Sequence, residues 1–260
     1  MRRAGTALIE TIRQVGILRT AIGLPGYVLQ MSERRRTRTE IREALAREGF
    51  DAAHGTDTAE VLFGLELGAF FNRSREAVFP YIPTYAETVR RPISLLPIDH
   101  SRFTFVDLGC GKGKPLLVAS RFPFKKLVGV DLSRVVLDVA ENNLAVCRDW
   151  CGPRSRFDLR CEDVESFVFP DGPLVIYLFN PFPQSVLSVV VKRLEASLSA
   201  SPREAVILYV NPEWRSAIES SPAFARIPTA LENLAVYATR PERWAWPEPT
   251  VSQGNLGPTP

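Results

Sequence analysis

The feature that most constrains the fold of this chain is the segment 103–113, where an apolar run reaches Asp107 and then a glycine-rich turn. The glycines of the turn alternate with other residues; they are Gly109, Gly111 and Gly113. An apolar helical pattern follows at once, with Pro115 in a first turn that needs no proline N–H. Glycines let a backbone approach a ligand closely, and a helix start adds oriented N–H donors. The segment therefore predicts a strand, a ligand-binding turn and a helix.

The acid before the glycines narrows the class of ligand. A carboxylate at Asp107 repels a pyrophosphate and suits a cation, and S-adenosylmethionine has both an α-ammonium and a sulfonium. The run Asp107-Leu-Gly-Cys-Gly-Lys-Gly113 resembles the first motif of class I S-adenosylmethionine-dependent methyltransferases. The resemblance implies that this turn holds the amino-acid end of S-adenosylmethionine.

Further elements of that family follow in order over roughly residues 85–240. A second strand ends at Asp131, 24 residues after Asp107, and the family places an acid there on the ribose hydroxyls, with Leu132 beside it. A third strand is followed by Asp163, where the family has an acid against the adenine amine. Taken singly, Asp131 could cap a strand end and Asp163 could cap a helix.

The alternation of apolar runs predicts an α/β fold, a Rossmann-like doubly wound, mostly parallel seven-stranded sheet. Two runs without an intervening helix, 224–231 and 233–239, predict an antiparallel hairpin at the sheet edge. We expect an N-terminal helical extension over 1–78, the cofactor-binding domain over 79–240 and a disordered tail over 241–260. The expected helices are 4–22, 33–48, 86–97, 116–122, 134–146 and 184–198. The expected parallel strands are the run from 103 that reaches Asp107, and 126–130, 157–161, 173–179 and 205–210.

Two further segments indicate the methyl acceptor. Asn180-Pro-Phe182 resembles the Asn/Asp-Pro-Pro-Phe/Tyr motif of amino-methyltransferases, which implies catalytic roles for Asn180 and Phe182 and a place for Asn180 at the cofactor. Phe79-Pro-Tyr-Ile-Pro-Thr84 is similar to a segment of some protein-lysine methyltransferases, which implies that Tyr81 and Thr84 cover the cofactor. Each segment lacks a proline of its motif. A strand-ending turn with a core phenylalanine, and a proline-rich packing loop, stay open as alternatives.

Charge and composition bound the partners. The net charge is only +3, but residues 1–50 carry +5, which indicates either an anionic partner such as RNA or lipid headgroups, or a solvated helix face. With two histidines and four cysteines without a CxxC pair, no metal site is predicted. No apolar run is long enough to span a bilayer and no secretory signal is evident, so we expect a cytoplasmic location.

These patterns predict a methyltransferase that uses S-adenosylmethionine, with an amine such as a protein lysine as acceptor. A nicotinamide-dependent oxidoreductase is the second enzymatic interpretation, and Asp107 with the G-x-G-x-G spacing argues against it. A non-catalytic cofactor- or RNA-binding module on the same fold is the third interpretation, through the arginine-rich N-terminus.

Overall fold

The computed structural model describes residues 38–62, 64–67, 79–231 and 233–244. The chain divides into two compact units, residues 1–47 and 48–260. In the first unit, residues 38–47 are helical, inside the helix expected over 33–48, whereas the helix expected over 4–22 lies outside the described residues. The domain division at 78 and 240 stays a prediction, although residues 48–62 belong to the larger unit.

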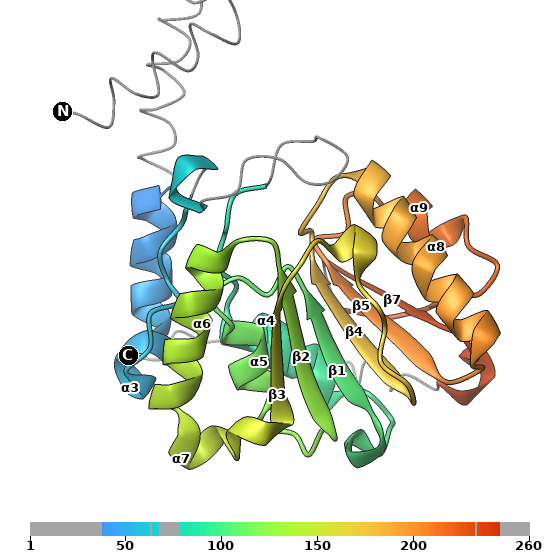
Figure 1. Ribbon diagram of the computed structural model, residues 1–260, viewed down its shortest axis with the longest axis horizontal. Helices are drawn as coiled ribbons and strands as arrows, with labels where there is room; N and C mark the ends of the chain where they lie inside the picture. Colours follow the sequence, from blue (N-terminus) through green and yellow to red (C-terminus); the bar gives the residue numbers. More distant parts are fainter. Residues whose placement is uncertain (1–37, 63, 68–78, 232, 245–260) are drawn as a thin grey trace, which may run out of the picture. The chain divides into compact units, whose positions relative to one another are not determined.

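The larger unit is built around a seven-stranded sheet with the strand order β3-β2-β1-β4-β5-β7-β6 (Figure 1). The pairs from β3 to β5 are parallel, and β7 runs antiparallel to both β5 and β6. The predicted α/β sheet with an antiparallel edge hairpin is thus confirmed. The strands are β1 Thr104–Leu108, β2 Lys126–Asp131, β3 Phe157–Cys161, β4 Leu174–Phe179, β5 Ala205–Val210, β6 Ala225–Ile227 and β7 Leu234–Ala238.

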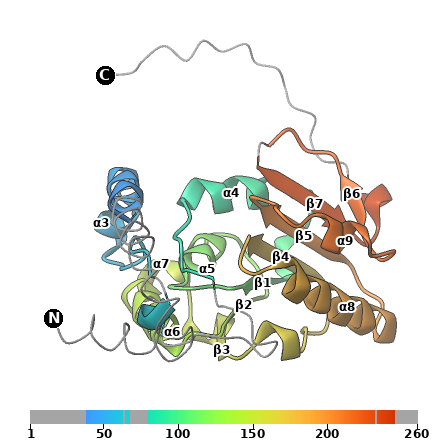
Figure 2. The same cartoon turned by 90° about the horizontal axis from the view of Figure 1, so that it is seen from above.

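Helices cover both faces of this sheet (Figure 2). Helices α4, α5 and α6 pack on one face, while α8 and α9 pack on the other. The helices are α3 Phe50–His54, α4 Ala86–Ser94, α5 Lys114–Ala119, α6 Arg134–Val146, α7 Arg148–Cys151, α8 Gln184–Ala200 and α9 Ser216–Glu219. Short 3₁₀ turns lie at Gly64–Leu67, His100–Arg102, Arg154–Arg156, Val164–Ser166 and Pro241–Arg243.

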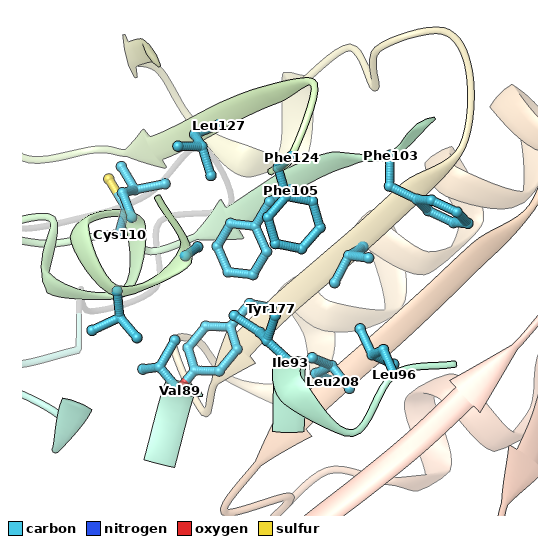
Figure 3. Packing of buried hydrophobic residues seen from close by; sticks show 14 of the residues in the cluster. Val89, Ile93, Leu96, Phe103, Phe105, Cys110, Phe124, Leu127, Tyr177 and Leu208 are labelled. Atoms are coloured by element: carbon cyan, nitrogen blue, oxygen red, sulfur yellow. The ribbon is translucent and has the colours of Figure 1, made fainter. Parts of the chain in front are cut away.

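The two faces follow from the alternation of side chains along each strand. Phe105 packs beside Tyr177 with ring centroids 6.0 Å apart, in the cluster shared with α4 and α5 (Figure 3). Their neighbours Val106 and Ile176 point the other way, into the cluster shared with α8. Successive side chains of a strand face opposite sides, so a continuous apolar run fills two cores at once.

The packed part of the chain reaches Trp244, within the segment expected to be a tail. Trp244 is buried and meets Phe103 edge to face, with ring centroids 6.3 Å apart. Residues 245–260, the rest of that segment, lie outside the described residues.

Candidate functional site

A cavity of about 520 Å³ lies at the carboxyl ends of the central strands. Open α/β sheets bind ligands at this edge, where the strand order reverses on either side of β1. Of the residues predicted for the site, Tyr81, Thr84, Asp107, Gly109, Asp131, Leu132, Asp163, Asn180 and Phe182 line the cavity. Gly111 and Gly113 do not line it, and they act through the backbone of the turn.

The glycine turn needs its glycines for two reasons. Gly109 and Gly111 have φ of 83° and 51°, in the left-handed region that other residues rarely adopt. A Cβ on Gly109 would lie 2.6 Å from Cβ of Pro181, and one on Gly111 would lie 2.2 Å from the Tyr81 ring. The turn is therefore packed directly against the segments that carry Tyr81 and Pro181. Gly113, with φ of 82°, caps the start of α5.

Asp107 is a buried acid with a free acceptor. It is only 2% exposed, and its Oδ2 has no hydrogen-bond partner among the described residues. Burial raises the pKa of Asp107 well above its ordinary value, and the charge of Asp131 adds to this. An unpaired buried carboxyl is costly unless a cation or donor meets it. The α-ammonium of S-adenosylmethionine fits that requirement.

Asp131 ends β2 and has a fixed carboxylate. Its Oδ2 accepts from the backbone N–H of Gly111 at 2.9 Å, and its Oδ1 accepts from that of Ser133 at 2.8 Å. Burial raises the pKa of Asp131, and these hydrogen bonds pull it back down. Each carboxylate oxygen keeps a further lone pair, so the two oxygens of Asp131 can accept hydrogen bonds from two neighbouring hydroxyls, such as those of a ribose.

Asp163 has a structural duty as well as a place on the cavity wall. Its side chain accepts from the N–H of Glu165 at 2.9 Å and caps the turn at Val164–Ser166. Asp163 therefore does cap a helical turn, as the alternative interpretation expected. Its contact with an adenine stays a prediction.

Tyr81 and Thr84 belong to a segment fastened over the glycine turn. Tyr81 forms an antiparallel bridge with Leu62, and its hydroxyl donates to the carbonyl of Thr58 at 2.8 Å. Burial raises the pKa of Tyr81 well above its ordinary value, with Asp51 and other nearby acids contributing. Tyr81 is therefore held as a donor and is a poor candidate for a base. Thr84 is buried at the cavity wall.

Asn180 follows β4, and its backbone and side chain are both constrained. It has φ of 42°, its Nδ2 donates to Oε2 of Glu213 at 2.9 Å, and its Oδ1 accepts from the Tyr209 hydroxyl at 3.0 Å. Phe182 is largely buried in the cluster that includes Val186, and it contributes to the core as well as to the wall. Its predicted catalytic role stays a prediction.

Sequence reasoning missed that two lysines are buried, one in the glycine turn and one at the first position of α5. Lys112 and Lys114 are 2% and 1% exposed. Nζ of Lys112 lies 2.8 Å from Oδ1 of Asp57, and Nζ of Lys114 lies 2.7 Å from Oε2 of Glu48. These pairs join the glycine turn to a segment more than fifty residues upstream. Apart from two lysines in and directly after a glycine turn, the sequence holds no signal for partners so distant.

Asn143 of α6 also links the glycine turn to the upstream segment, and the sequence analysis did not identify it. Its Oδ1 accepts from the N–H of Asp57 at 2.9 Å, while its Nδ2 donates to the carbonyls of Asp57 and Lys112 at 3.0 and 2.9 Å. Both donors of one buried amide, and its oxygen, are thus used to hold residue 57 to the turn.

Three further properties bear on the chemistry. Cys110, Cys147 and Cys151 are buried, Cys161 is exposed, and none of the four is in a disulfide. The described residues contain no group of three or more histidines, cysteines and acids able to hold a metal ion. No helix in the described ranges has both the length and the apolar character needed to cross a bilayer.

Most of the residues predicted for this site lie in a part of the chain that matches a known protein family. Residues 106–180 match the family described as a methyltransferase domain. That range contains Asp107, the glycine turn, Asp131, Asp163 and Asn180. S-adenosylmethionine is the methyl donor for this class of domain, and the unpartnered carboxyl of Asp107 fits it.

Solved structures with similar folds include three methyltransferases. A ribosomal protein L11 methylase from Lactobacillus delbrueckii subsp. bulgaricus is 16% identical, with a TM-score of 0.40 over 58% of this chain and 73% of that one. The magnesium protoporphyrin IX methyltransferase of Synechocystis PCC 6803, with bound S-adenosylmethionine, is 13% identical, with a TM-score of 0.40 over 59% and 77%. The N,N-8-amino-8-demethyl-D-riboflavin dimethyltransferase of Streptomyces davawensis is 15% identical, with a TM-score of 0.45 over 59% and 54%. No curated protein sequence matches the chain.

Proposed function

The chain is an S-adenosylmethionine-dependent methyltransferase, and we propose that its methyl acceptor is an amine, such as the side chain of a protein lysine. The observation that carries this proposal is the setting of Asn180. An amide oxygen fixed at the cavity wall, with a carboxylate hydrogen-bonded to the same amide, suits an N–H donor that becomes cationic.

The cofactor residues have separable tasks. We assign Asp107 to the α-ammonium of the donor and Asp131 to its ribose hydroxyls, because the first has an unpartnered oxygen and the second has two oriented ones. When bound, S-adenosylmethionine supplies a sulfonium methyl that is transferred by in-line displacement. The chain's own contribution is to hold the acceptor in line, and such positioning can supply roughly 7–11 kcal/mol of the barrier in favourable cases.

The charges of the cavity favour an amine over a nucleic acid. Three carboxyls, Asp107, Asp131 and Asp163, line the wall, and Lys114, the one cation that lines it within the described part of the chain, is paired with Glu48. Glu213 adds an exposed carboxylate next to Asn180. A phosphate backbone approaching Asn180 meets the like charge of Glu213, whereas a cationic acceptor is drawn to it.

Asn180 can also act during the reaction. As the acceptor nitrogen attacks, it gains positive charge, and an amide oxygen already in place stabilises that charge without reorganising. The rings of Phe179 and Phe182 lie in the same wall and offer a surface that tolerates a cation. A lysine must first lose its proton, and lowering its pKa by about three units costs roughly 4 kcal/mol, which desolvation and the nearby sulfonium charge can provide.

Methyl transfer from a radiolabelled donor to fractionated cell lysate tests the acceptor class. We expect label in the protein fraction, stable to base and located on lysine after acid hydrolysis. Asn180→Ala should lower that label strongly, and Asp131→Ala should abolish it. Label on a carbon, oxygen or sulfur atom of the acceptor would overturn the amine proposal, and label in RNA or DNA would overturn the lysine acceptor.

Two features predicted from the sequence stay predictions beside this proposal. The arginine-rich stretch proposed for an anionic partner falls largely outside the described residues, and a cytoplasmic location rests on the sequence alone. A purified protein that binds RNA with steep salt dependence and transfers no methyl group to any fraction would favour the non-catalytic module.

A further inference from the structure

We propose that Tyr209 and Glu213 are positioning residues, which act through Asn180 and set the direction in which its amide faces. This inference rests on the proposed function, because it explains how the site selects an acceptor nitrogen that carries hydrogen. The three residues come from the ends of β4 and β5, which lie side by side in the sheet.

The hydrogen bonds of this group form a chain with a defined direction. The backbone N–H of Trp214 donates to the Tyr209 oxygen at 3.3 Å, and the Tyr209 hydroxyl donates to Oδ1 of Asn180 at 3.0 Å. Nδ2 of Asn180 then donates to Oε2 of Glu213 at 2.9 Å. A backbone N–H can only donate and an ionised carboxylate can only accept, so both ends of the chain fix its polarity.

That polarity decides which atom of Asn180 is left for a ligand. With one N–H of Nδ2 directed to Glu213 and one lone pair of Oδ1 taken by Tyr209, the amide keeps a fixed orientation in which the second lone pair of Oδ1 is available as an acceptor. Without the two partners, the side-chain amide can rotate by about 180° at little energetic cost, and its N–H groups then take the place of the oxygen. The network therefore holds that lone pair in one place, where it can accept a hydrogen bond from a group such as an amine.

The supports of the amide are themselves held firmly. Tyr209 is fully buried in the core on the α8 side of the sheet, so its hydroxyl has little freedom. Burial raises the pKa of Tyr209, which keeps the hydroxyl protonated and able to donate. The strand end that carries Glu213 is tied down where the N–H of Asn211 donates to the carbonyl of Asn233 at 2.8 Å.

Two cofactor analogues test the inference without knowledge of the acceptor. Sinefungin has an amine-bearing carbon where S-adenosylmethionine has its methylated sulfonium, and S-adenosylhomocysteine has there an uncharged sulfur that bears neither a methyl group nor an amine. The ratio of their dissociation constants, measured by isothermal titration calorimetry, reports how well the site receives an amine at the point of transfer.

We expect Tyr209→Phe and Glu213→Ala each to weaken sinefungin about three- to tenfold, the range expected from loss of one hydrogen bond, while S-adenosylhomocysteine stays within about twofold. On an Asn180→Ala background, the effect of Tyr209→Phe on the ratio should vanish, because the positioning residue then has nothing to position. Glu213→Gln, which keeps an acceptor oxygen, should retain most of the ratio.

Tyr237→Phe is the matched control. Tyr237 is also buried in this core cluster, and its hydroxyl bonds to Glu219 at 3.0 Å, away from Asn180. It should leave the ratio unchanged.

An unchanged ratio in the variants that fold, whether neither analogue or both analogues equally are weakened, would overturn the positioning role. Because Glu213 is exposed, its variants serve as the test even if Tyr209→Phe does not fold. These outcomes are distinct from failure of the proposed function. An altered ratio together with label on a carbon or oxygen atom would keep the positioning role and remove the amine acceptor.

Discussion

The carboxylate of Asp131 accepts a hydrogen bond from the backbone N–H of Gly111 at 2.9 Å, so the end of β2 is tied to the glycine turn that follows β1. The same carboxylate also accepts from Ser133, which caps α6. One acid thereby links two βα turns and also lines the cavity. The geometry of the cofactor site is set before any ligand binds.

Replacing Gly111 tests how closely the turn is packed. Gly111→Ala places a methyl group 2.2 Å from the Tyr81 ring, in addition to the strain of a positive φ. Gly172→Ala is the matched control, because Gly172 has φ of 81° and no atom lies within 4 Å of the position that its methyl group would take. In urea denaturation, Gly111→Ala should cost about 1–3 kcal/mol more than Gly172→Ala. Equal losses of unfolding free energy in the two variants would show that the Tyr81 ring moves aside without a cost in stability.

Replacing Asp107 should separate stability from binding. The pKa of Asp107 is raised in the folded protein, so between the unfolded-state value of about 3.9 and the higher folded-state value the folded protein binds more protons. The free energy of unfolding of the ligand-free protein therefore falls, from this group, as pH rises through that interval.

In Asp107→Asn this contribution disappears. We expect the variant, free of ligand at neutral pH, to be more stable than the parent by about 1 kcal/mol, and to bind S-adenosylmethionine at least about tenfold more weakly. Urea denaturation from about pH 4 to 7 and calorimetry measure the two effects. A variant that loses stability and keeps its affinity would contradict the assignment of Asp107.

Removing Lys112 and removing Asp57 should lower the free energy of unfolding by different amounts. The Lys112 side chain is buried, whereas that of Asp57 is 61% exposed. Asp57→Asn removes the nearest carboxylate from a buried ammonium and leaves Glu60 at 3.7 Å as its remaining acidic partner among the described residues, which should cost about 1–3 kcal/mol. Lys112→Met leaves an acid that water can solvate, and should cost less. Urea denaturation of both variants checks the order, and the reverse order would contradict it.

Tyr81→Phe tests whether Tyr81 serves chemistry or structure. Loss of the hydrogen bond to the Thr58 carbonyl should lower the free energy of unfolding by about 1 kcal/mol. Because the raised pKa of Tyr81 keeps its hydroxyl protonated, the pH–rate profile for label transfer should keep its shape. A lost or displaced alkaline limb would make Tyr81 the base.

The fold was predictable because its strands have clear local patterns. Fully buried strands such as β4 read as unbroken apolar runs, and the glycine turn marks where β1 gives way to α5. The strands β3 and β5 have the predicted bounds, whereas α8 continues two residues beyond the predicted end. The small helices α7 and α9 were not predicted, because four-residue turns carry too little periodicity.

The site was predictable only where its residues follow strand ends. Asp107, Asp131 and Asn180 are found in this way, since the carboxyl ends of parallel strands meet at one edge. The partners that hold them were not found. Tyr209 reads as an ordinary core residue of an apolar strand, Glu213 as an ordinary surface acid, and Lys112 as a solvated lysine. Their roles depend on contacts between residues 29 to 55 positions apart, which no local pattern encodes.

Isothermal titration with S-adenosylmethionine tests the central claim most directly. We expect saturable binding of one molecule per chain in the micromolar to millimolar range for the parent protein. Asp131→Ala should abolish detectable binding while the far-ultraviolet circular dichroism spectrum is retained. A parent protein that gives no heat of binding, or an Asp131→Ala variant that binds as tightly as the parent, would contradict the assignment of this cavity to the methyl donor.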